Sequence, residues 1–200
     1  MRLLSIDPGL HGLGCGLFED GVLLVGWYAA CPGTGRGPAR WRAVVEAGLE
    51  PVRGYHLDTV VVEQMQVYHR ATREDPADLL EVQGVAGAIA GWVAPGTELV
   101  GYLPRVWKGA VPQLTYANRV DAYLRHRGWA DALLACPVRR RHDMLHGVGI
   151  GLHHLGLVVG GRTGWGRGAS RVAHRQQVEG VEDVRPGGGG LGVASFGSFE

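Results

Sequence analysis

Cysteines are scarce in this sequence: there are three in 200 residues, at Cys15, Cys31 and Cys136. An odd number without a close pair predicts neither a disulfide framework nor a zinc cluster. Long apolar runs are missing too, because Asp7 interrupts the first hydrophobic stretch, so that neither a signal peptide nor a membrane span is predicted. We therefore expect a cytoplasmic protein that does not bind membranes.

An excess of charge of either sign is also missing, since 20 Lys and Arg stand against 19 Asp and Glu, for a formal net charge of +1. Proteins that bind duplex DNA over a long surface usually have a basic face. The total hides clustering, because basic residues gather around residues 36–53, at Arg105 and Lys108, and at residues 139–141. The apolar content of 46% in 200 residues predicts one domain with a sizeable core.

Two predicted strands end in a carboxylate. The first strand, from Leu3, ends on Asp7 and leads into a glycine-rich turn, and the β-branched run from Thr59 ends on Glu63. A buried carboxylate is costly unless a cation or donors compensate it, and a metal ion is one such cation. If the two strands are adjacent in a parallel sheet, Asp7 and Glu63 meet at its edge. The alternatives are an ordinary hairpin turn at Asp7 and a loop start at Glu63.

A third candidate element is the segment 139–152, which reads as a helix with Asp143 and His146 on one face. Gly147, Gly149 and Gly151 weaken a helix interior, so they predict a backbone packed closely against the sheet. Both polar side chains could reach one metal ion. The alternative for His146 is a packed or capping group.

These segments together resemble the RuvC family of Holliday junction resolvases over about residues 2–158. The resemblance lies in Ile6-Asp7-Pro8-Gly9, Val62-Glu63-Gln64, Pro104-Arg105-Val106-Trp107-Lys108-Gly109 and Asp143-x-x-His146-Gly-x-Gly-Ile-Gly-Leu. The Trp-Lys-Gly-x-Val-Pro segment is most similar to phage-type members. A bacterial protein, or a phage protein acting in the host cytoplasm, is therefore expected.

The resemblance implies an α/β, RNase H-like fold with a five-stranded mixed sheet flanked by helices. It also implies metal-dependent cleavage of phosphodiester bonds in branched DNA, in recombination or DNA processing, with no small-molecule cofactor. The implied ligands of two Mg²⁺ or Mn²⁺ ions are Asp7, Glu63, Asp143 and His146. Two such ions about 3.5 to 4 Å apart activate water and stabilise the transition state. The family usually has aspartate where this chain has His146, which favours Mn²⁺ over Mg²⁺.

Lys108 is the only lysine of the chain and lies within a family motif. An ammonium group can approach a phosphate or a leaving oxygen as a point charge, so we expect Lys108 to act in catalysis and DNA binding. Arg105 lies close to Lys108 in the sequence, and we expect it to bind DNA as well. A loop with Tyr68, Arg70 and Arg73 follows Glu63, and its aromatic and basic side chains could stack on or wedge into DNA. The alternative is a surface loop without such a role.

The remaining pattern predicts strands over 12–19 and 22–30, a helix over 38–49, and a helix capped by Asp75 and begun by Pro76. Four small residues give this last helix a flat face that can accept another helix: Gly84, Gly87, Ala88 and Gly91. The resemblance implies that this helix contributes to a homodimer, and the alternative is packing within the chain. We expect a nuclease domain over 1–159 and a flexible Gly/Arg-rich tail over 160–200.

Two other functions remain open. The first is a junction-binding protein in which His146 marks weakened catalysis. The second is an actin-like ATPase or phosphotransferase, since those folds also open with a strand, an acid and a glycine-rich hairpin. They require a second phosphate loop in the C-terminal half, and the sequence shows none.

Overall fold

The computed structural model describes residues 1–31, 33–65 and 75–157. The chain begins with an antiparallel meander of three strands: β1 (Arg2–Gly9), β2 (Gly12–Glu19) and β3 (Val22–Ala30). These strands confirm the predicted ranges, and β1 runs two residues past Asp7. The predicted tail over 160–200 and its boundary at residue 159 fall outside the described residues.

Two further strands run parallel to β1. Helix α1 (Pro38–Leu49) leads through a 3₁₀ turn (Glu50–Val52) to β4 (Thr59–Glu63), which pairs with β1. Helix α2 (Pro76–Trp92) leads to β5 (Glu98–Tyr102), which pairs with β4. The result is a five-stranded mixed sheet in the order β3-β2-β1-β4-β5.

The start of α2 follows from its first residues. Asp75 caps the helix by accepting a hydrogen bond from the Ala77 N–H at 2.9 Å, and Pro76 occupies the first helical position. Proline is tolerated there because the first N–H groups of a helix have no partner within it. The predicted capping is confirmed.

Between β5 and residue 157 the structure describes helices, turns and one isolated β-bridge from Leu133 to Gly26. The helices and turns are α3 (Pro104–Trp107), α4 (Gln113–His126), two 3₁₀ turns (Ala130–Ala132 and Val138–Arg140) and α5 (Arg141–His154). The helix predicted from residue 139 therefore begins at Arg141. Pro137 starts a 3₁₀ turn instead, in which the Arg140 N–H donates to the Pro137 carbonyl at 2.7 Å.

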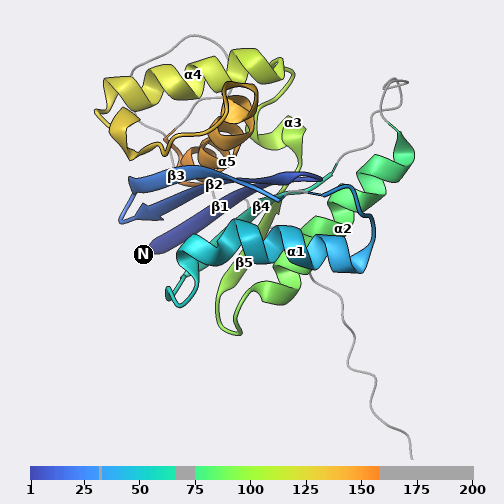
Figure 1. Ribbon diagram of the computed structural model, residues 1–200. Coiled ribbons are helices and arrows are strands. Elements are labelled where there is room, and N and C mark those ends of the chain that lie inside the picture. Colours follow the sequence, from blue (N-terminus) through green and yellow to red (C-terminus); the bar gives the residue numbers. More distant parts are fainter. Residues whose placement is uncertain (32, 66–74, 158–200) are drawn as a thin grey trace, which may run out of the picture. The chain divides into compact units, whose positions relative to one another are not determined.

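Helices cover both faces of the sheet, α1 and α2 on one face and α4 and α5 on the other (Figure 1). Neighbouring residues of a strand point to opposite faces. Leu4 and Ile6 of β1 accordingly pack in the cluster with α1 and α2, whereas Leu3 packs in the cluster with α4 and α5. By the same alternation Asp7 points toward α5. Within the described ranges, no helix combines the length and apolar character needed to cross a membrane.

Candidate functional site

The register between β1 and β4 brings the two strand-end acids together. Ser5 pairs with Val61 and Ile6 with Val62, so that Asp7 and Glu63 are the next residues along two adjacent parallel strands. Val61 belongs to the apolar cluster with α4 and α5, and Glu63, two residues further, points to the same face. The adjacency that the sequence left conditional is confirmed.

Glycines allow α5 to approach the sheet closely enough to reach these acids. A Cβ on Gly14 would lie 2.0 Å from the Asp143 carbonyl oxygen, and a Cβ on Gly147 would lie 2.2 Å from the Gly14 carbonyl oxygen. No side chain fits at either position. The buried Ser5 hydroxyl donates to the Gly147 carbonyl at 2.7 Å, which ties α5 to β1. The close packing against the sheet that the glycines predict is confirmed for Gly147 and Gly151, whereas Gly149 faces Tyr116 and Val120 of α4.

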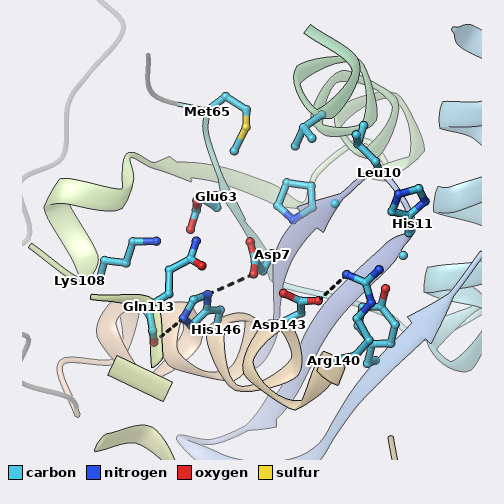
Figure 2. A pocket seen from close by; sticks show the side chains of 15 residues that line it. Asp7, Leu10, His11, Glu63, Met65, Lys108, Gln113, Arg140, Asp143 and His146 are labelled. Atoms are coloured by element: carbon cyan, nitrogen blue, oxygen red, sulfur yellow. Dashed lines mark hydrogen bonds and ion pairs between the residues drawn. The ribbon is translucent and has the colours of Figure 1, made fainter. Parts of the chain in front are cut away.

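A pocket of about 190 Å³ lies where these elements meet. Figure 2 shows Asp7 at its centre, with Glu63 and Lys108 on one side and Asp143 and Arg140 on the other. All five predicted catalytic residues line this pocket. They come from four parts of the chain that are separated by as many as 139 residues, from Asp7 to His146.

Glu63 is held in an electrostatically unfavourable position. It is 5% exposed, and burial together with the nearby charge of Asp7 raises its pKa from 4.5 to about 8, although Lys108 and the nearby Trp107 indole N–H oppose the shift. The indole N–H is close enough to act on the carboxylate but does not reach it in hydrogen-bond geometry. Among the described residues, Glu63 Oε2 and Trp107 Nε1 are buried polar atoms without a hydrogen-bond partner. A buried carboxylate oxygen without a donor is compensated well by a cation.

Asp143 already has two basic partners. His142 Nε2 lies 2.8 Å from its Oδ1, and Arg140 Nη1 lies 3.3 Å from its Oδ2. Burial raises the pKa of Asp143, and Asp7 adds to this shift, whereas His142 and Arg140 oppose it. Both carboxylate oxygens are therefore engaged, and ion binding at Asp143 requires an exchange of partners.

His146 is oriented by its surroundings. Its Nε2 lies 3.1 Å from the Gln113 backbone carbonyl, which can only accept, so this nitrogen carries the proton. Its Nδ1 points to Asp7 Oδ2 at 3.6 Å. The rings of Trp107 and Tyr116 pack edge-on against the imidazole, with centroids 5.6 and 6.1 Å away. His146 is therefore a packed side chain that also presents a nitrogen to the pocket.

The structure separates the two basic residues of the segment after β5. Lys108 is 9% exposed, lines the pocket, and places its Nζ 5.1 Å from the centroid of the Trp107 ring. Arg105 lies on the exposed side of α3 and does not line the pocket. The other predicted DNA-binding residues lie outside the described residues: Tyr68, Arg70 and Arg73.

Sequence reasoning missed several neighbours of the site. Arg140 was one of a cluster of arginines, and nothing in its spacing distinguished it from Arg139. The Gln113 carbonyl has no sequence signal, because every residue carries the same group. Trp107 and Tyr116 are buried aromatic residues whose contact with His146 depends on the packing of α3 and α4.

The residues present fit a hard divalent cation. Three carboxylates and one imidazole suit Mg²⁺ or Mn²⁺, and the unpartnered Glu63 Oε2 is an available ligand atom. Within the part of the chain that the structure describes, no three His, Cys, Asp or Glu side chains are grouped to hold a single ion. Mg²⁺ usually takes one or two protein carboxylates and completes its shell with water and phosphate oxygens.

The fold has known counterparts. RuvC of T. thermophilus in complex with a Holliday junction substrate matches with a TM-score of 0.53 and 22% identity, over 78% of this chain and 98% of that chain. Another T. thermophilus RuvC structure matches with a TM-score of 0.50 and 24% identity, over 78% and 93%. The match to the yeast mitochondrial Holliday junction resolvase Ydc2 is weaker, with a TM-score of 0.41 and 12% identity, over 74% of this chain and 76% of that chain.

No family model matches the sequence, and no curated protein does. The structural comparisons establish the class of fold: the chain has a RuvC-like α/β fold with a five-stranded mixed sheet flanked by helices. The fold predicted from the sequence is thereby confirmed. In its architecture, this chain is similar to Holliday junction resolvases.

Proposed function

We propose that this chain is a metal-dependent endonuclease that cleaves phosphodiester bonds in branched DNA, with the four-way Holliday junction as its substrate. The observation that carries the proposal is the meeting of Asp7, Glu63 and Asp143 in one pocket, with a buried and unpartnered Glu63 Oε2. The RuvC-like fold supports the choice of substrate. The resemblance to RuvC and to phage-type members supports an activity in DNA recombination in the cytoplasm of a bacterium or of a phage host.

The residues that line the pocket have different roles in this proposal. Asp7, Glu63, Asp143 and His146 would hold Mg²⁺ or Mn²⁺, two ions in all, which supply an activated water and stabilise charge on the phosphate. Asp7 lies between the other acids and is suited to share both ions. Lys108 stands beside Glu63, and its ammonium group can meet a non-bridging or leaving oxygen of the phosphodiester.

Binding of the rest of the DNA needs residues beyond the pocket. Arg105 on the exposed side of α3 and the loop residues Tyr68, Arg70 and Arg73 are our candidates for phosphate contacts and base stacking. The Trp107-Lys108-Gly109-x-Val111-Pro112 segment supports a position close to phage-type resolvases.

The test is a cleavage assay on labelled four-way junctions, three-way branches, flaps and linear duplex, with Mg²⁺, Mn²⁺ or EDTA. We expect the four-way junction to be cut with either metal and left intact in EDTA. Asp7→Asn should abolish cutting while junction binding persists, because contacts elsewhere supply the affinity. Asp131→Asn, which changes an exposed aspartate of the turn Ala130–Ala132, should cut like the wild type. Cutting by Asp7→Asn at the wild-type rate, or cutting in EDTA, would contradict the mechanism.

A second candidate is a junction-binding protein with weakened catalysis. The observation in its favour is that His146 Nδ1 faces Asp7 and that both Asp143 oxygens have basic partners. The same assay separates the two functions. Tight junction binding by the wild type without cutting in either metal would favour the second one.

We further propose that the protein acts as a homodimer through α2. Gly84 packs within the chain, since a Cβ there would meet the Trp41 ring, whereas Gly87 and Gly91 face open space. Leu80 on the same helix is 72% exposed. Two-fold symmetry would present two sites to a four-way junction. Gly87→Arg should shift the mass measured by light scattering from dimer to monomer, and a wild type that is already monomeric would refute the dimer.

A further inference from the structure

Arg140 occupies a defined place at the rim of the pocket. It ends the turn Val138–Arg140, directly before α5, and its side chain is 34% exposed. Its guanidinium carbon lies 5.8 Å from the centroid of the Tyr28 ring, which also lines the pocket. The aromatic face and the backbone hydrogen bond to Pro137 keep this cation at the site.

The bond that Arg140 makes to Asp143 is weak for its type. The distance of 3.3 Å from Nη1 to Oδ2 exceeds the about 2.7 to 2.9 Å of a charge-assisted hydrogen bond. Asp143 also has His142 on its other oxygen. A carboxylate that takes up a divalent ion exchanges such partners, and the Arg140 contact at 3.3 Å is longer than the His142 contact at 2.8 Å.

The charges of the pocket indicate what Arg140 can bind once it leaves Asp143. Asp7 and Asp143, and Glu63 once it is ionised, repel a DNA strand. The permanent cations among the lining residues are Lys108 and Arg140. In Figure 2 these two flank the acids from opposite sides, Lys108 beside Glu63 and Arg140 beside Asp143. A strand whose cleaved phosphate lies at the acids would bring a neighbouring phosphate toward each end of the pocket.

We propose that Arg140 is a DNA-binding residue that contacts the phosphate next to the one cleaved, on the side opposite Lys108, and that it rests on Asp143 when no metal ion is bound. A guanidinium can bind a phosphate with two parallel N–H donors, and the Tyr28 ring lies beside the Arg140 guanidinium at the pocket. This inference rests on the proposed function and adds a substrate contact to it.

The experiment compares Arg140→Gln with Arg139→Gln, which removes the same charge from the exposed neighbouring side chain. Binding of a fluorescent four-way junction is measured in Ca²⁺ and in EDTA at several salt concentrations, with the DNA checked to be intact. In Ca²⁺, Arg140→Gln should bind about tenfold more weakly than Arg139→Gln, with a salt slope smaller by about one. In EDTA the difference should shrink, because Arg140 then rests on Asp143.

Titration with Mn²⁺ alone gives a second measurement, in which Arg140→Gln is expected to bind more tightly than the wild type, whereas it binds DNA more weakly. Arg140→Gln should bind Mn²⁺ about two- to fivefold more tightly than the wild type, because a cation that competes for Asp143 is gone. A residue that only supports the fold would weaken both Mn²⁺ and DNA binding when replaced. Arg140→Lys should keep part of the DNA affinity, and it replaces Arg140→Gln in the comparison if the glutamine variant unfolds.

The outcomes separate this inference from the proposed function. Equal DNA affinities of Arg140→Gln and Arg139→Gln in Ca²⁺ would overturn the role of Arg140, even in a protein that cuts junctions. Weaker Mn²⁺ binding by Arg140→Gln would overturn it as well. A wild type that cuts no DNA would refute the nuclease, whereas the predicted pattern of DNA and Mn²⁺ binding would still establish the phosphate contact.

Discussion

Glu63 should make the metal-free protein less stable as the pH rises, and Glu63→Gln should remove this loss. The folded protein keeps the Glu63 proton until about pH 8, whereas the unfolded chain releases it near 4.5. Between these values the folded state binds more protons, so its stabilisation is present below pH 4.5 and is lost as the pH rises toward 8. At about 1.4 kcal/mol for each pH unit, the loss in unfolding free energy is up to roughly 5 kcal/mol.

Glutamine has the shape of the protonated acid and does not ionise. Urea unfolding in EDTA should therefore give similar stabilities for Glu63→Gln and the wild type at pH 5, and a large advantage for the variant at pH 8.5. Glu46→Gln, on the exposed side of α1, is the matched control and should follow the wild type. Adding Mn²⁺ at pH 8.5 should raise the stability of the wild type more than that of Glu63→Gln, since binding to the folded state stabilises it.

The result that would refute this reasoning is a wild type and a Glu63→Gln variant whose stabilities differ by less than about 1 kcal/mol over the whole range, which is the size of an ordinary exposed interaction. Glu63 would then be solvated in the metal-free protein, and its unpartnered oxygen would give no argument for a cation. If Mn²⁺ does not reduce the difference in stability between Glu63→Gln and the wild type at pH 8.5, the buried charge of Glu63 is not part of a metal site.

Three other changes test separate parts of the site. Lys108→Ala should slow junction cleavage about a hundredfold while changing junction affinity only severalfold, as read from single-turnover rates and binding isotherms; equal losses in both would make Lys108 a binding residue only. His146→Asp should raise the rate in Mg²⁺ relative to that in Mn²⁺, because an oxygen ligand replaces a nitrogen; an unchanged ratio of the two rates would mean that His146 is not a ligand. Deletion of residues 162–200 should leave melting temperature and cleavage unchanged, since the described residues up to Leu157 already form two apolar clusters; an insoluble product would move the domain boundary.

The sequence by itself determined most of the architecture, because the signals are local. Apolar runs ending in Asp7 and Glu63, the turns between the first three strands, and the Asp75-Pro76 helix start all depend on neighbouring residues. Asp143 and His146 share a helix face for the same reason. The resemblance to RuvC connected these local elements into a fold that the structure confirms.

Tertiary structure alone decided how the site residues meet and which groups surround them. Whether Asp7 lies beside Glu63 depends on β1 pairing with β4. The 51 residues between Asp7 and Thr59 carry no local signal of this pairing. The pKa of Glu63 depends on its burial and on the charges of Asp7 and Lys108, which lie far from it in the sequence. Arg140 and Arg139 look alike in sequence, and only the turn before α5 turns one of them toward Asp143. Patterns along a chain carry periodicity and spacing, whereas charge pairing and desolvation are properties of the packed interior.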